Sequence, residues 1–202
     1  MFYKENDEVK LDEVTLNNTF VSKLTDIELL KTYIHYTYPI QSARESLVAM
    51  NQIKMDSLEL MQRFFYKFWK DRDPFQPETV WNNYLAQVEL VNKSFKNGLT
   101  PGYKTDRGRI YLQYGSPNSR QQEVLPKVFE PFEVWHYYHI ESERDVKFVF
   151  MNKNRPNEYR LVLTNKQGEI SDMDWVYRFQ EEYYDNQDKG IHSPWDFFDN
   201  PQ

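Results

Sequence analysis

The sequence predicts an α+β fold in which a helical N-terminal half is packed on a small, mainly antiparallel four-stranded sheet. Up to Gly98 the apolar residues recur at steps of three and four, which is the period of an amphipathic helix. After Gly102 come short runs of β-branched and aromatic residues separated by turn residues, and such local connections favour antiparallel pairing. The 202 residues also include 15 Tyr, 14 Phe and 5 Trp, which supply enough large side chains for a substantial core.

The chain is expected to open with a polar connector, residues 1–24, before a helical region that spans residues 25–98. Thr25 followed by Glu28 has the capping-box pattern, in which a hydroxyl and a carboxylate three residues later satisfy the first free amides of a helix. Pro39 is expected to end this first helix.

A second capping box at Ser42 begins an apolar face that continues over residues 42–70. This stretch forms either one helix or two helices that break near residues 54–56. Pro77 suits the first position of a further helix, and Gly98 is a natural residue just beyond its end.

Four strands are expected in the second half, within a sheet region that spans residues 99–180. They are Ile110–Tyr114, Phe132–Tyr138, Val146–Phe150 and Tyr159–Leu163. Residues 118–131 are long for a hairpin loop, and connections of that length are often functional or carry a short helix.

The helical and sheet regions together, residues 25–180, are expected to form one compact unit, followed by an aromatic tail, residues 181–202. The tail contains Trp195, Phe197 and Phe198. Large rings near a terminus dock on the body of the protein or on a partner, because their exposure to water is unfavourable.

Composition excludes several classes of function. The net charge is −6 and the basic residues form no stripe, so no nucleic-acid partner is expected. The absence of cysteine removes thiol nucleophiles, disulfides and thiolate metal sites. The chain has no run of about 18 apolar residues and no apolar leader at its start, so neither a transmembrane segment nor a signal peptide is expected within it.

No cofactor, metal ion or catalytic residue is assigned. The chain has only 6 Gly and none of the glycine-rich loops that hold phosphate, and it lacks the motifs that present a nucleophilic serine. Of the 4 His, His136 and His139 lie three apart on an expected strand, which puts them on opposite faces. They therefore cannot both bind one metal ion from that strand.

The densest polar segment is residues 104–109, and it allows two interpretations. In the first, Asp106 is an acid, base or ligand that Arg107 and Arg109 keep ionised. In the second, Asp106 and its neighbours hydrogen-bond backbone amides at a turn. We favour the second interpretation because turns of this kind are so common.

The residues around this segment resemble a known family. Residues 101–111 read Pro-Gly-Tyr-Lys-Thr-Asp-Arg-Gly-Arg-Ile-Tyr, and Tyr-Gly-Ser-Pro follows at 114–117. This pattern is similar to the signature of the GWxTD domain, which is named for Gly-Trp-x-Thr-Asp, with Tyr103 in place of the tryptophan. Upstream helix-end residues at 68–74 and an aromatic strand at 131–138 extend the likeness, which covers about residues 25–165.

The motif and its flanks supply the candidate structural or partner-binding positions. They are Tyr103, Thr105, Asp106, Arg107, Gly108, Arg109, Gly115, Pro117, Arg72, Asp73 and Trp135.

The resemblance implies a protein of the cell envelope of Gram-negative bacteria, periplasmic or associated with the outer membrane, and attached through an N-terminal lipid anchor outside this chain. It implies no activity. We therefore expect a non-catalytic structural or protein-interaction module, the C-terminal part of an envelope protein with protein partners. The alternative is a glycan-binding or hydrolytic domain that uses Asp106, Arg107 and Arg109.

Overall fold

The computed structural model describes residues 19–123, 131–152, 158–174 and 198. Its contacts divide the chain into two compact units, with the boundary between Leu85 and Ala86. This boundary falls inside the helix α4 (Pro77–Phe95), which therefore contributes residues to both units. The division predicted from the sequence, with residues 25–180 as one unit, stays a prediction.

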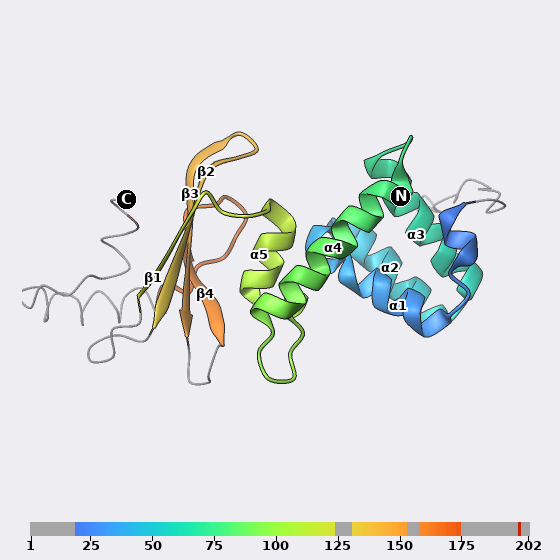
Figure 1. Cartoon of the computed structure of the whole chain (residues 1–202), viewed down its shortest axis with the longest axis horizontal. Helices are drawn as coiled ribbons and strands as arrows, with labels where there is room; N and C mark the ends of the chain where they lie inside the picture. Colours follow the sequence, from blue (N-terminus) through green and yellow to red (C-terminus); the bar gives the residue numbers. More distant parts are fainter. Residues whose placement is uncertain (1–18, 124–130, 153–157, 175–197, 199–202) are drawn as a thin grey trace, which may run out of the picture. The chain divides into compact units, whose positions relative to one another are not determined.

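The first unit is helical (Figure 1). Its elements before α4 are η1 (Phe20–Lys23), α1 (Ile27–Tyr36), η2 (Tyr38–Ile40), α2 (Ala43–Met55) and α3 (Leu58–Arg72).

Side-chain caps fix where these helices begin and end. The predicted capping box at Ser42 is present, because its hydroxyl accepts from the Glu45 amide at 3.2 Å and the Glu45 carboxylate accepts from the Ser42 amide at 2.7 Å. The predicted cap at Thr25 is wrong by one residue, since it is the Asp26 carboxylate that accepts the first amides of α1. Asp56, at a left-handed φ of 54°, separates α2 from α3, so residues 42–70 form two helices.

Aromatic rings fill the core of this unit. Phe65 meets Trp81 edge to face with ring centroids 4.8 Å apart, and Trp69 lies 5.4 Å from Trp81. The hydroxyl of Tyr84 has a hydrogen-bond partner within this core, because it donates to the carbonyl oxygen of Tyr36 at 2.7 Å. Edge-to-face pairs of this kind add stability beyond the area they bury.

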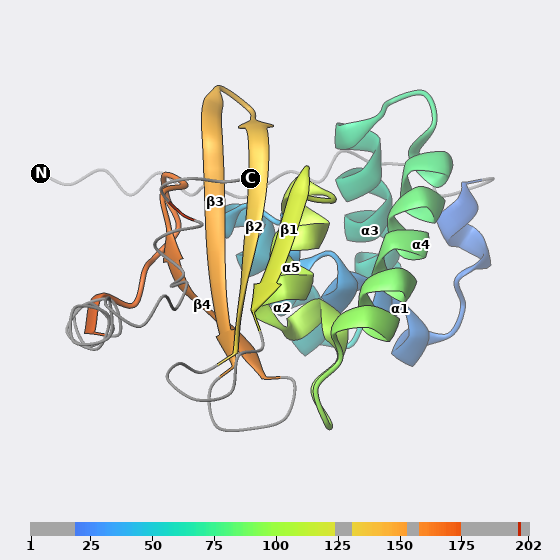
Figure 2. The same ribbon diagram turned by 60° about the vertical axis from the view of Figure 1, so that its left-hand side comes forward.

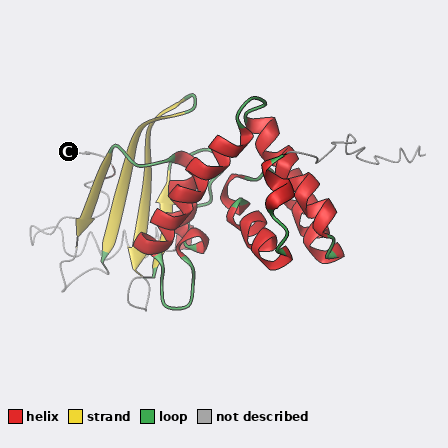
Figure 3. Cartoon of the chain, turned by 45° about the vertical axis from the view of Figure 1, so that its right-hand side comes forward, coloured by secondary structure: helices red, strands yellow, loops and turns green. Residues whose placement is uncertain are grey.

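The second unit holds the rest of α4, two short helical elements and the sheet (Figure 2). Its elements are η3 (Gly102–Lys104), α5 (Asp106–Tyr114), β1 (Ser119–Glu123), β2 (Phe132–Ile140), β3 (Glu143–Asn152) and β4 (Tyr159–Thr164). All neighbouring strands pair antiparallel in the order β1-β2-β3-β4. The predicted α+β class, with most helices first and a four-stranded antiparallel sheet after them, is confirmed (Figure 3).

One strand of the prediction is wrong. Ile110–Tyr114, which has the composition of a strand, is the second half of the helix α5. The Thr105 hydroxyl caps the start of that helix and Gly115, at a φ of 81°, ends it, so the caps outweigh the local β propensity. The fourth strand is instead β1, a run of polar residues inside the segment expected to be a loop.

The two faces of the sheet have different coverings. On one face the Trp135 ring lies 5.5 Å from Phe95 of α4 and 6.4 Å from Tyr111 of α5. The opposite face carries a buried apolar cluster, and Phe198 of the C-terminal tail packs against it. The members of this cluster are Phe132, Val134, Val149, Met151 and Val162. The other tail aromatics, Trp195 and Phe197, lie outside the described residues.

We predict that Phe198→Ala destabilises the protein, because it removes a ring that packs on the buried apolar cluster of the sheet. The expected loss is about 1–3 kcal/mol, below the ~3–5 kcal/mol of a fully buried ring, as measured by urea unfolding. Phe75→Ala, at a residue 92% exposed, serves as the matched control. Equal stability of the two variants would contradict the packing role of Phe198.

Candidate functional site

The polar segment forms two consecutive elements of the second unit, η3 and the first half of α5. Thr105 lies at their junction and serves both. Its hydroxyl donates to the carbonyl oxygen of Gly102 at 2.7 Å and accepts from the Gly108 amide at 3.1 Å. One short side chain therefore ends η3 and starts α5.

Two glycines allow the backbones of this segment to touch. A Cβ on Gly102 would overlap the carbonyl oxygen of Val91 in α4, and a Cβ on Gly108 would overlap the carbonyl oxygen of Gly102. Neither glycine has a left-handed φ, so close approach rather than conformational freedom requires them. The Tyr103 amide also donates to the Asn92 side chain at 3.1 Å, which fixes η3 on α4.

Asp106 connects the start of α5 to the sheet. Its Oδ2 atom accepts a hydrogen bond of 2.8 Å from the backbone amide of Leu161. Leu161 belongs to β4, which is an edge strand, and the amides on the outer side of an edge strand have no partner within the sheet. The carboxylate therefore satisfies an edge amide and also sits in the first turn of a helix, where negative charge is favourable.

Arg107 forms a buried ion pair with the sheet. Its guanidinium, 3% exposed, donates to Glu133 of β2 at 2.9 Å, and the Glu133 carboxylate is fully buried. The same carboxylate accepts from the Trp135 indole at 2.8 Å and pairs with Arg120 of β1. The guanidinium of Arg107 also lies 4.0 Å from the Tyr159 ring centroid.

Burial has a direct electrostatic effect on this cluster. It lowers the pKa of Arg107 to about 10, because removal from water disfavours the charged form. That value still leaves the guanidinium protonated at neutral pH. Burial lowers the pKa of Arg120 as well, and the neighbouring positive charge of Arg107 adds to the shift. The two arginines thus repel each other and depend on the carboxylate between them.

Arg109 forms a second connection, to the residues after β4. Its two terminal nitrogens each donate to one oxygen of Glu169 at 2.7 Å, and the Tyr114 hydroxyl donates to the same carboxylate at 3.2 Å. Partial burial alone would raise the pKa of Glu169, but the hydrogen bonds and charge of Arg109 outweigh it and lower the pKa.

The remaining candidate positions have other roles. Gly115 ends α5 and its carbonyl oxygen accepts from the Tyr137 hydroxyl at 2.8 Å, while Pro117 lies in the short connection to β1. The motif lies in the second unit, whereas Arg72 and Asp73 belong to the first. There Asp73 accepts the amides of Phe75 and Gln76 at 2.8 and 2.9 Å, which forms the turn between α3 and α4.

Sequence reasoning missed the partners of the motif, which are Asn92, Glu133 and Glu169, and it missed Arg120, which pairs with Glu133. A signal existed for Glu133, because an acidic residue there stands in phase with Trp135 and Tyr137 on the inward face of an aromatic strand. An ionisable residue at a core position of that kind needs a buried counter-charge.

The side chains of Asp106, Arg107 and Arg109 thus each bind other residues of the protein. Among the described residues, no group of three or more His, Asp or Glu side chains could hold a metal ion. Within the same part of the chain, none of the helices is long and apolar enough to cross a membrane.

The fold and the site define a class of α+β protein. In this class, a polar motif at the start of a helix binds that helix to one face of an antiparallel sheet through hydrogen bonds and ion pairs. The sequence matches the GWxTD domain over residues 2–181, so the chain belongs to that family. This match is wider than the extent inferred from the motif and its flanks. Neither a curated protein nor a solved structure matches the chain.

We predict that Gly108→Ala destabilises the protein by about 2 kcal/mol or more, because the new Cβ meets backbone atoms that cannot move aside cheaply. Gly168→Ala is the control, since that glycine has a φ of +85° but open space around it, and costs about 1 kcal/mol. Thermal unfolding measures both. A smaller loss at Gly108 than at Gly168 would show that the backbones do not touch in solution.

We expect Glu133→Gln to cost about 3–5 kcal/mol, because it removes the buried negative charge that two arginines face. Glu59→Gln removes a carboxylate from a pair whose acidic member is 66% exposed, and should change stability by less than about 1 kcal/mol. Urea unfolding compares the two. Similar small losses would mean that the buried cluster is not needed for stability.

The Arg109–Glu169 pair predicts a pH dependence. The folded-state pKa of Glu169 lies below its ordinary value of 4.5, so the pair stabilises the fold above that pH, and the contribution disappears as the pH falls through the folded-state pKa. Glu169→Gln should therefore flatten the loss of stability on acidification from neutral pH to below 4.5. Glu89→Gln, at an exposed position on α4, should leave the profile unchanged.

Proposed function

We propose that this chain is a non-catalytic structural or protein-interaction module, the C-terminal part of a bacterial cell-envelope protein that works with protein partners. One observation carries the proposal: Asp106, Arg107 and Arg109 all form hydrogen bonds within the protein. These hydrogen bonds join the first half of α5 to the sheet and to the residues that follow β4, which is what a structural role for the three side chains requires.

The envelope location rests on the family resemblance. On this proposal the whole protein is periplasmic or an outer-membrane lipoprotein, and a lipid anchor preceding this chain attaches it to the membrane. The second unit then supplies a rigid platform, and the surfaces of the helical unit and of the tail meet the partners. Rigid, pre-formed surfaces bind at a lower entropic cost than surfaces that must order on binding.

The contacts argue against the alternative of a glycan-binding or hydrolytic domain built on the same residues. A glycosidase needs two carboxyl groups that face one sugar from about 5–10 Å apart. Asp106 faces a backbone amide of β4, and Glu133 is fully buried between arginines. Neither carboxylate is placed to meet a sugar.

Cross-linking followed by purification of the tagged, full-length protein from envelope fractions tests the proposal. A stoichiometric protein partner is the expected result. Recovery of the protein alone from cross-linked envelopes would contradict it, as would recovery from the cytoplasmic fraction.

We predict that Asp106→Ala lowers the free energy of unfolding by about 1–2 kcal/mol, because an edge amide loses its acceptor and the first turn of α5 loses a favourable negative charge. Thermal unfolding and hydrolysis assays with glycan and ester substrates are run on the same samples. If the variant melts like the native protein but abolishes a hydrolytic activity that the native protein has, Asp106 is catalytic and the proposal fails.

A further inference from the structure

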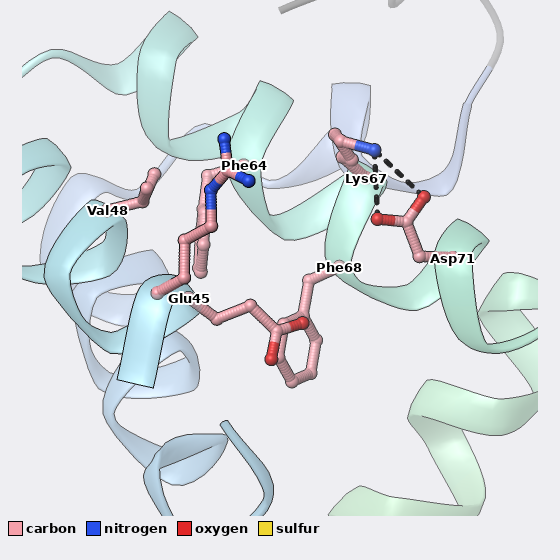
Figure 4. Close-up of a pocket in the computed structure, with 7 residues that line it drawn as sticks. Glu45, Val48, Phe64, Lys67, Phe68 and Asp71 are labelled. Atoms are coloured by element: carbon pink, nitrogen blue, oxygen red, sulfur yellow. Dashed lines mark hydrogen bonds and ion pairs between the residues drawn. The ribbon is translucent and has the colours of Figure 1, made fainter. Parts of the chain in front are cut away.

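A cavity of about 330 Å³ lies in the first unit, between α2 and α3 (Figure 4). Its lining is apolar in part and charged in part: Val48, Phe64 and Phe68, with Arg44, Glu45, Lys67 and Asp71. We call it the α2–α3 groove. Its volume is at the lower end of the ~300–1,000 Å³ of small-ligand sites, which suits one large side chain and its neighbours.

The helix α2, which contributes Arg44, Glu45 and Val48 to the groove, also carries exposed apolar residues. Helical spacing puts Leu47 beside Arg44 and puts Met55 two turns along from Val48 on the same side of the helix. Leu47 and Met55 are 66% and 65% exposed. These side chains would add apolar contact area for a partner bound at the groove.

Three of the four charged side chains around the groove have an ion-pair partner. Glu45 is neutralised by Arg72, which donates to it at 2.9 Å and stacks on Phe68 with the guanidinium carbon 3.4 Å from the ring centroid. Lys67 and Asp71 pair with each other at 2.9 Å, both about half exposed, an arrangement worth about 0–1 kcal/mol and easily rearranged.

Arg44 is the exception. It is exposed at the groove and makes no hydrogen bond or ion pair with any residue in the described parts of the chain. The groove therefore offers a cation beside an apolar hollow. The complementary ligand is an apolar body with a carboxylate next to it.

We propose that the α2–α3 groove binds a segment of a partner protein in which a large apolar side chain stands next to an Asp or Glu. The apolar side chain enters the hollow beside Val48 and Phe64, and the carboxylate pairs with Arg44. Arginine is enriched among interface hot spots, and hot-spot side chains fill well-packed pockets on the partner. This inference rests on the proposed interaction function and names the chemistry of the partner.

The test uses the whole chain, labelled with ¹⁵N, and two capped synthetic peptides in an NMR titration. The first peptide is Gly-Phe-Asp-Leu-Asp-Gly, and in the second both acids are replaced by asparagine. We expect the acidic peptide to shift the amide signals of residues 44–48 and 64–68 in a saturable way. The asparagine peptide should bind at least about tenfold more weakly, because it cannot pair with Arg44.

Two charge reversals on α2 supply the matched variants. Arg44→Glu should weaken binding of the acidic peptide by about tenfold or more, whereas Lys54→Glu should change it by less than about twofold. Lys54 is exposed on the same helix and does not line the groove. Both replaced side chains are exposed, so both variants should fold, with a slight gain in stability for Arg44→Glu in the first turn of α2 and a slight loss for Lys54→Glu in its last turn. Thermal unfolding of each variant therefore accompanies the titration.

Several results would overturn the inference: equal binding of both peptides, shifts confined to other residues, or an unchanged affinity in Arg44→Glu. A concentration-dependent dimer that Arg44→Glu dissolves in sedimentation velocity would assign the groove to a second copy instead. If the peptides fail but the cross-linked partner is still recovered from envelopes, the groove inference is wrong and the proposed function stands.

Discussion

The fully buried carboxylate of Glu133 is the constraint on which the second unit depends. Its removal from water is costly unless opposite charges and donors surround it, and these come from three elements: Arg107 of α5, Arg120 of β1 and Trp135 of β2 itself. The helix must therefore begin where it does. The strand β1 has no apolar residue, so hydrophobic burial contributes little to its pairing with β2. The ion pair between Arg120 and Glu133 stabilises this pairing instead.

The structure explains the residue type at each named position of the family motif. Gly102 lets two backbones touch, Thr105 caps a helix, and Asp106 occupies an edge amide of the sheet. The tryptophan position is filled here by Tyr103, whose ring is 6% exposed. Burial raises the pKa of its hydroxyl, which stays neutral, so the tyrosine serves as a large core ring in the place of the indole.

Sequence patterns predicted the fold class, the capping box of α2, the start of α4 and three of the strands, because each depends on residues close together in the chain. They failed at Ile110–Tyr114, where strand-like composition yielded to helix caps, and at β1, whose polar residues give no strand signal. At residues 104–109 the sequence favoured side chains that hydrogen-bond backbone amides at a turn, and it named none of the distant partners. Arg107 and Glu133 are 26 residues apart and Arg109 and Glu169 are 60 apart, separations that no local pattern reports.

The helix α4 carries a further consequence for how such proteins can evolve. Trp81 and Tyr84 serve the core of the first unit, whereas Val88 and Val91 of the same helix are buried in the second. A recombination event that separated the units at their boundary would cut a helix in its middle and leave both products without part of their interior. The two units are therefore expected to be inherited together, and gene fusions should join this module at its termini rather than within it.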